Sequence, residues 1–160
     1  MRRHLSAPIE TRPDPTWPAG IAVRHPGPAD AGDLASLMLD AYRGTVDDDG
    51  ETIDDARAEV DGYLSGGVGA PLLEPSFVAL AAGDLVAACL VSLHDGRPLM
   101  AYQMTAAHWK RRGLATGLLV AALNALALAG YTHAHLWVTS GNEPAERIYD
   151  RLGFAEEAGS

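Results

Sequence analysis

The residues best suited to chemistry lie in one short stretch, Lys110-Arg111-Arg112-Gly113-Leu114-Ala115-Thr116-Gly117. It separates a strand-like segment, residues 99–105, from a long apolar segment, residues 114–128, that is typical of a helix. Glycines let backbone N–H groups approach a ligand closely, and a helix start leaves N–H groups unpaired at the positive end of the helix dipole. Together with three cations, this arrangement predicts a binding site for a pyrophosphate group.

A second polar pattern lies near the end of the chain, in residues 142–154. Asn142, Ala145 and Tyr149 are spaced so that all three can lie on one side of a helix that stops at Gly153. A tyrosine hydroxyl can donate a proton, although its ordinary pKa of about 10 makes it a weaker acid than a thiol at about 8.5. The residues alone also allow Tyr149 to be an ordinary core aromatic.

The elements that must position these patterns alternate in type along the chain, in the order β-α-α-β-β-β-α-β-α-β. This order predicts one mixed α/β (α+β) domain over residues 20–160, preceded by a proline-rich arm over residues 1–19 that is extended or mobile. Periodicity, caps and turn residues predict strand 21–24, helices 30–43 and 52–64, a loop at 66–75, strands 77–81, 85–93 and 99–105, helix 113–129, strand 133–139, helix 143–152 and a short last strand.

Composition excludes several classes of function. The formal net charge of −9 argues against nucleic-acid binding, because the phosphate backbone demands a positive face. Residues 114–129 fall short of the roughly 20 residues that a membrane span requires. The only cysteine, Cys89, lies in an apolar run, which indicates a small buried residue in a reducing, cytoplasmic compartment. His133 and His135 share a strand face without a further ligand at suitable spacing, so no metal is expected.

With both patterns placed, the chain resembles the GNAT superfamily of N-acetyltransferases over roughly residues 20–158. The specific part of the likeness is residues 104–154. Lys110 to Ala115 is similar to that family's acetyl-CoA loop, Gln/Arg-x-x-Gly-x-Gly/Ala, although lysine departs from the first position. Residues 142–154 keep every spacing of its Asn-x-x-Ala-x-x-x-Tyr-x-x-x-Gly-Phe signature.

The resemblance implies a central mixed sheet whose strand at 102–105 splays from the strand at 135–138, with backbone groups near Met104 polarising a thioester carbonyl. It implies an acetyl group moved from acetyl-CoA, as co-substrate, to a primary amine by direct attack, with Tyr149 protonating the departing thiolate. The residues that it assigns to acetyl-CoA are Met104, Thr105, Lys110, Arg111, Arg112, Gly113, Leu114, Ala115, Thr116, Asn142 and Ala145. A non-catalytic acyl-CoA-binding regulatory module is the alternative. A dinucleotide oxidoreductase is excluded, because the chain has no Gly-x-Gly-x-x-Gly.

The acceptor, a small amine or a peptide, is not identified by the sequence. Acidic residues crowd the segment between the first two helices, which suits either a cationic acceptor or a solvated loop before a helix start. These residues are Asp47, Asp48, Asp49, Glu51, Asp54 and Asp55. The spacing does not fit an EF-hand calcium loop. Glu74, His94 and His108 are candidates for a general base, and the oligomeric state is open, with a homodimer as one alternative.

Overall fold

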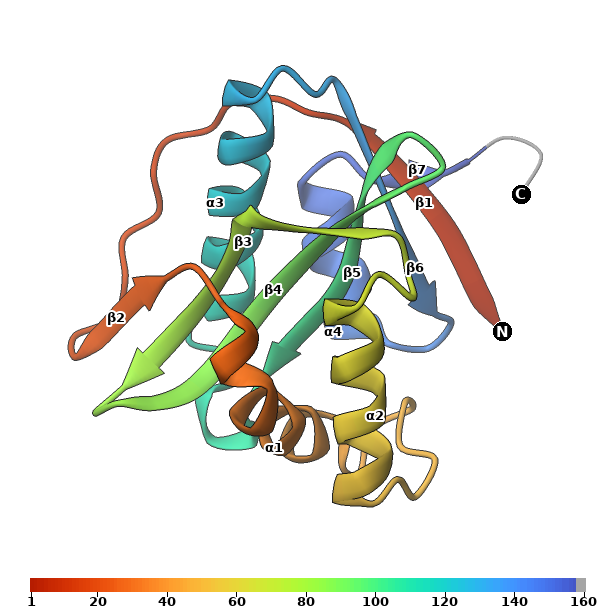
Figure 1. Ribbon diagram of the computed structural model, residues 1–160. Helices are drawn as coiled ribbons and strands as arrows, with labels where there is room; N and C mark the ends of the chain where they lie inside the picture. Colours follow the sequence, from red (N-terminus) through yellow and green to blue (C-terminus); the bar gives the residue numbers. More distant parts are fainter. Residues whose placement is uncertain (158–160) are drawn as a thin grey trace.

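The computed structural model describes residues 1–157, in which one seven-stranded sheet carries helices on both faces (Figure 1). The strands lie in the order β2-β3-β4-β5-β6-β1-β7. Neighbouring strands are antiparallel except β5 and β6, which are parallel. The elements are β1 (Arg2–Pro8), β2 (Ile21–Arg24), α1 (Ala31–Tyr42), α2 (Ile53–Leu64), β3 (Ala70–Ala81), β4 (Asp84–His94), β5 (Arg97–Thr105), α3 (Leu114–Leu128), β6 (His133–Thr139), α4 (Glu143–Arg151) and β7 (Ala155–Glu156), with 3-10 turns at Pro28–Asp30 and Ala107–Trp109. The predicted α/β class is therefore confirmed.

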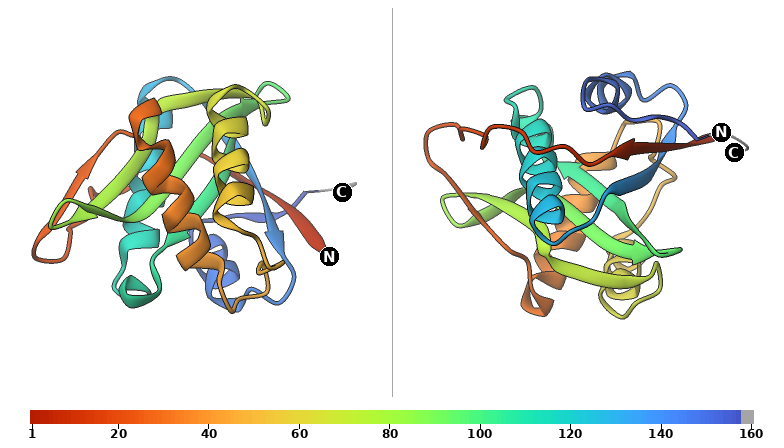
Figure 2. Two further views of the ribbon diagram at one scale, coloured as in Figure 1. Left: turned by 60° about the horizontal axis from the view of Figure 1, so that its bottom comes forward. Right: turned by 90° about the horizontal axis from the view of Figure 1, so that it is seen from above.

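Helices α1 and α2 cover one face of the sheet, and α3 and α4 cover the other (Figure 2). The predicted cap of α2 is present, because Thr52 Oγ1 accepts from the Asp55 amide at 3.2 Å and the Asp55 carboxylate accepts from the Thr52 amide at 2.9 Å. This reciprocal pairing satisfies two amides that the helix start leaves without partners. The first turn of α2 is thereby fixed, and with it the loop that joins α1 to α2.

Strand β1 was not predicted, although it lies inside the sheet. All seven of its residues pair with β6, from Arg2 opposite Thr139 to Pro8 opposite His133. Polar residues interrupt any apolar alternation in this segment, and its partner strand lies at the other end of the chain, so local pattern could not reveal it. Strand β7 then pairs with the outer edge of β1.

The rest of the N-terminal arm lies against α3. The Asn124 side chain accepts from the amide of Arg12 and donates to the carbonyl of Arg12, both at 2.9 Å. Trp17 packs on the helix so closely that a Cβ at Gly117 would lie 2.6 Å from its ring. These contacts hold the arm against α3 at Arg12 and Trp17.

The loop predicted at residues 66–75 is wrong in its second half. Residues 70–75 belong to β3, which pairs with β4 both before and after a register shift between Leu72 and Phe77. The buried hydroxyl of Ser76 bridges this shift, since it donates to the Leu72 carbonyl at 2.6 Å and accepts from the Val91 amide at 2.8 Å. Pro71 and Pro75 read as breakers in the sequence, but a β-bulge accommodates such residues within a strand.

Candidate functional site

The gap between β5 and β6 is the central feature of the site. The two strands share a single paired position, Leu99 opposite His135, and no further pairing joins them within residues 1–157. Beyond Leu99, β5 continues to Thr105 while β6 runs to Thr139, so the sheet is open on that side. The predicted splay of these strands is thus present in the structure.

Backbone groups on the open edge of β5 belong to Gln103 and Thr105. The Ala106 amide donates to the Val86 carbonyl at 2.8 Å, and antiparallel pairing alternates between bonded and non-bonded residues. Met104 therefore directs its amide toward β4, whereas Gln103 and Thr105 direct theirs toward the gap. Of the backbone groups near Met104, the amides of Gln103 and Thr105 are therefore the ones that face the gap, and the Met104 side chain is buried on the α1 and α2 side.

The loop before α3 directs amide groups toward the same end of the gap. Arg111 and Gly113 both adopt left-handed backbone conformations, with φ of 66° and 83°. Gly113 is the N-cap of α3 and provides no side-chain cap, so amides in the first turn, at Leu114, Ala115 and Thr116, are left for another partner. The positive end of the helix dipole adds to this preference for an anion.

Two of the three cations in this loop have partners within the protein. The Lys110 ammonium donates to the Ala41 carbonyl near the end of α1, at 2.8 Å. The Arg112 guanidinium lies over the Trp109 ring, 4.7 Å from its centroid. The loop therefore offers mainly backbone amides to a ligand, which is the arrangement that a pyrophosphate requires.

Tyr149 lies on α4 with only 7% of its surface exposed. Its ring contacts Phe154 edge to face, at 5.9 Å between centroids, and its hydroxyl makes no hydrogen bond within residues 1–157. Burial, and then the nearby Cys89 and Asp47, raise the pKa of Tyr149 well above its ordinary value. The hydroxyl is therefore protonated at neutral pH and can donate. Asn142 is the N-cap of the same helix, and Ala145 packs against the core.

Cys89 is fully buried on β4, as predicted. Gln103 Nε2 donates to its sulfur at 2.8 Å, and burial raises the pKa of the thiol to about 12. A thiol with this pKa is not a nucleophile at neutral pH, because the thiolate is the reactive form. Cys89 is a structural residue beneath the gap.

The three candidate bases lie on separate elements. Glu74 and His108 are exposed, in the bulged part of β3 and in the 3-10 turn that follows β5. His94 lies at the β4–β5 turn, opposite Arg97, which is the closed end of the strand pair. None of them meets the Tyr149 hydroxyl, so the structure does not bring the predicted acid and these bases together.

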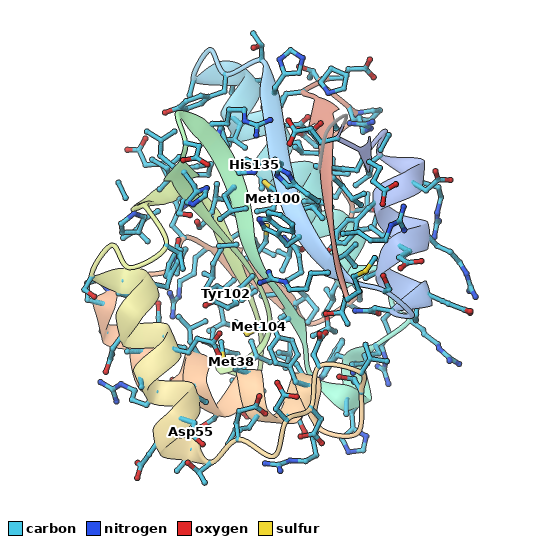
Figure 3. All side chains as sticks on the ribbon, turned by 90° about the vertical axis from the view of Figure 1, so that its right-hand side faces the viewer. Met38, Asp55, Met100, Tyr102, Met104 and His135 are labelled. Carbon is cyan, nitrogen blue, oxygen red and sulfur yellow. The ribbon has the colours of Figure 1, made fainter. Side chains whose placement is uncertain are left out.

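Residues that the sequence did not single out lie on the α1 and α2 side of the gap. The Thr139 hydroxyl, at the end of β6, donates to Asp47 Oδ1 at 2.6 Å. The Tyr102 hydroxyl donates to Glu59 Oε1 on α2 at 3.2 Å, and Figure 3 shows Tyr102 and Met104 lying toward these helices, away from His135. The acidic pattern had already drawn attention to Asp47, but no local signal marks Thr139 as its partner.

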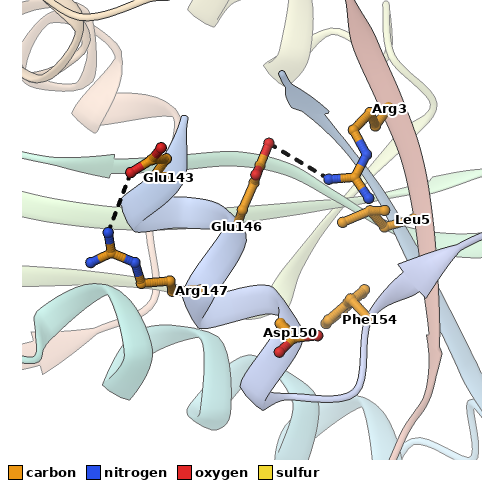
Figure 4. Close-up of a pocket in the computed structure, with 7 residues that line it drawn as sticks. All are labelled: Arg3, Leu5, Glu143, Glu146, Arg147, Asp150 and Phe154. Atoms are coloured by element: carbon orange, nitrogen blue, oxygen red, sulfur yellow. Dashed lines mark hydrogen bonds and ion pairs between the residues drawn. The ribbon is translucent and has the colours of Figure 1, made fainter. Parts of the chain in front are cut away.

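A separate hollow of about 320 Å³ lies between β1 and α4 (Figure 4). Its arginines are neutralised within the hollow, since Arg3 pairs with Glu146 at 3.6 Å and Arg147 with Glu143 at 3.4 Å. Because most of its charged side chains form ion pairs with one another, we do not assign a catalytic role to this hollow. Within the described residues there is neither a cluster of side chains able to hold a metal ion nor a helix long and apolar enough to cross a membrane.

Several solved structures of similar fold are named as acetyltransferases. The chain superposes on a GCN5-related N-acetyltransferase from Sphaerobacter thermophilus with a TM-score of 0.75 and 20% identity, covering 98% of this chain and 48% of that one. A GNAT-family acetyltransferase from Brucella melitensis in complex with acetyl-CoA matches with a TM-score of 0.65 and 20% identity, covering 84% and 82% of the two chains. The structure of AAC(6')-Iy, in complex with the bisubstrate analog CoA-S-monomethyl-acetylneamine, matches with a TM-score of 0.63 and 16% identity, covering 85% of this chain and 91% of that one.

These identities establish the fold alone, and the chain spans about half the length of the Sphaerobacter protein. No curated protein matches the sequence. The family model described as FR47-like protein matches residues 77–159, which include β4, β5, the loop before α3 and α4. The chain therefore belongs to the FR47-like family, and its fold is that of the GNAT acetyltransferases.

Proposed function

We propose that this protein transfers an acetyl group from acetyl-CoA to a primary amine by direct attack. The observation that carries the proposal is the opening between β5 and β6, with the amide-rich start of α3 at its wide end. A pyrophosphate at the α3 loop would direct the thioester arm into that opening. Transfer in a single step needs both substrates in contact, and an open sheet edge gives the amine access from the opposite face.

The residues divide the reaction between them. The amine nitrogen attacks the thioester carbonyl, and amides of Gln103 and Thr105 on the open edge of β5 stabilise the charge that develops on its oxygen. The carbon–sulfur bond then breaks and the sulfur takes a proton. Tyr149 first stabilises the leaving thiolate by hydrogen bonding and then delivers its proton, which solvent replaces. The proton that the amine nitrogen loses as the amide forms passes to water.

Calorimetry and thiol release together test the proposal. We expect acetyl-CoA to bind the purified protein, and free thiol to appear when polyamines, aminoglycosides, amino acids or peptides are added. Calorimetry that detects no binding of acetyl-CoA at millimolar concentration would overturn the proposal.

Gly113 provides a matched pair of variants for the cofactor loop. Its φ of 83° strains any other residue, and Gly83 in the β3–β4 turn has a φ of 87° with equally open surroundings. Each Gly→Ala change should cost about 1 kcal/mol of stability. Only Gly113→Ala should also weaken acetyl-CoA binding, by about tenfold, because it reshapes the amide cradle. Equal affinities of the two variants would contradict a role for this loop.

A non-catalytic acyl-CoA-binding module is the second candidate, favoured by the absence of any hydrogen bond from Tyr149 to Glu74, His94 or His108 within residues 1–157. It predicts acetyl-CoA binding without thiol release across the whole amine panel. In either case, the single buried Cys89 fits a reducing, cytoplasmic environment.

A further inference from the structure

Asp47 differs from the other acidic residues of the α1–α2 loop in the hydrogen-bond partner of its carboxylate. The Thr139 hydroxyl, from the far side of the gap, donates to one oxygen of its carboxylate at 2.6 Å, and its own amide donates to Thr45 Oγ1 at 3.2 Å. Asp48, by contrast, accepts from the amides of Gly44 and Gly50 and thereby closes its own loop. Asp49 is exposed. Of the three consecutive aspartates at 47–49, Asp47 is the one whose carboxylate bonds to a residue at the end of β6.

The Asp47 carboxylate lies near two tyrosines. It is one of the charges that raise the pKa values of Tyr149 and Tyr42, after burial, which is the larger cause for both residues. The Tyr149 side chain is more than nine-tenths buried, and its hydroxyl has no hydrogen-bond partner in the described chain. The hydroxyl oxygen is nevertheless accessible from the surface, so a ligand at this position can accept a hydrogen bond from it.

A second carboxylate supports the negative character of this region. Glu59 accepts from the Tyr102 hydroxyl at 3.2 Å and, like Asp47, raises the pKa of Tyr42. The Arg2 guanidinium lies over the exposed Trp137 ring, 5.7 Å from its centroid, and its charge lowers the pKa of Tyr102 against the larger effect of burial. The region therefore presents two carboxylates, those of Asp47 and Glu59, and carboxylates favour a bound cation.

We propose that the acceptor is an aliphatic primary amine that binds as its ammonium ion, with Asp47 as its anchor and Thr139 as the residue that positions Asp47. Thr139 uses one oxygen of the carboxylate and leaves the other for the ammonium group. The inference rests on the proposed function and adds to it the chemical class of the acceptor.

The proton balance follows from binding the charged form. The ammonium first releases one proton to water, and the free amine then attacks. A second proton leaves the nitrogen as the amide forms, and one proton reaches the sulfur of coenzyme A through Tyr149. Because an aliphatic ammonium has a pKa of about 10.4, the rate at saturating amine should rise as the pH is raised from 7 to 9.

Asp47→Asn tests the anchor, with Asp49→Asn as a control that removes the same charge from the same loop. With spermidine as the amine, Asp47→Asn should raise the KM for spermidine by about tenfold or more while leaving the KM for acetyl-CoA unchanged. Asp49→Asn should change both by less than about twofold. Asp47→Glu should restore part of the affinity, which a purely structural role of Asp47 would not predict.

Thr139→Val tests the positioning residue, because it keeps the shape of the side chain and removes the hydroxyl. We expect a smaller rise in the KM for spermidine than in Asp47→Asn, and no additional rise when the two changes are combined. Independent, multiplicative effects would show that Thr139 does not act through Asp47.

The outcomes separate this inference from the proposed function. Acetyl-CoA binding and spermidine acetylation with an unchanged KM in Asp47→Asn would overturn the anchor and leave the transferase standing. So would wild-type protein that acetylates aniline, a neutral amine at pH 7, in preference to spermidine. Failure of acetyl-CoA to bind, or absence of thiol release with every amine, would overturn both.

Discussion

Tyr149 combines a buried ring with a hydroxyl that no residue of the described chain satisfies. Its spacing from Asn142 could be read directly from the sequence, because Asn142 is the N-cap of the helix that carries Tyr149. The same holds for Gly113, whose turn is local. The bond between Thr139 and Asp47 could not be read in this way, because it joins residues 92 positions apart. Local patterns therefore predict the cofactor side of the site better than the acceptor side.

Replacement of Tyr149 by phenylalanine should lower kcat by about 100-fold, the lower end of what a general acid contributes. The dissociation constant of acetyl-CoA should change little, since the ring remains in place. Because the pKa of Tyr149 is raised, wild-type activity should not fall through loss of its proton up to about pH 10. Steady-state kinetics and calorimetry provide these values. Tyr131→Phe, in a half-buried tyrosine before β6, is the control, and equal kcat values for the two variants would remove Tyr149 from the mechanism.

At the scale of elements, helix α3 is constrained on two sides. One side packs on the sheet, and the other receives the N-terminal arm through Trp17 and Asn124. The long apolar pattern predicted a buried helix correctly, but it did not reveal that the arm provides part of the cover. Strand β3 is a second element that local pattern predicts only in part. Its prolines predicted a loop, but a bulge stabilised by Ser76 keeps them in the sheet.

Gly117→Ala should destabilise the protein by about 1–3 kcal/mol, the usual cost of overpacking. The new Cβ would lie 2.6 Å from the Trp17 ring, which is too close for any real contact. Trp17→Leu should remove the conflict, so the double variant should be more stable than the sum of the two single changes predicts. Urea unfolding measures all three. Strictly additive values would mean that the arm does not pack on α3 in solution.

At the scale of the whole molecule, the two ends of the chain meet in a cluster of histidines. His4 of β1 contacts Glu157 at 2.8 Å and His135 of β6 at 2.9 Å, and His135 Nε2 approaches the His94 carbonyl at 3.2 Å. Arg97 pairs with Glu157 as well. Composition and element order predicted the domain and its class, but this cluster depends on β1, whose place in the sheet no local pattern shows.

The cluster makes stability depend on pH in a defined direction. Burial lowers the pKa of His135, so the unfolded chain binds more protons than the folded one below about pH 6.5. Arg97 lowers the pKa of Glu157, which adds a similar loss below about pH 4.5. Stability should therefore decrease as the pH falls from 7 to 4. His4, His94 and Asp95 are the other ionisable residues that face the cluster.

Urea unfolding as a function of pH measures this dependence. Glu157→Gln should flatten the curve below about pH 4.5, and His135→Gln should flatten it near pH 6.5. The exposed His133 on the same strand provides the control, because His133→Gln should leave the curve unchanged. A wild-type protein that is equally stable at pH 5 and pH 7.5 would contradict the argument.

The position of β1 also decides how the protein should be handled. The Ser140 amide donates to the Met1 carbonyl at 2.8 Å, and Arg2 lies opposite Thr139. A purification tag fused ahead of Met1 would emerge beside the hydroxyl that holds Asp47, where a run of histidines could compete with an incoming ammonium ion. The last described strand, β7, pairs with Leu5 and Ser6 on the opposite edge of β1 from β6.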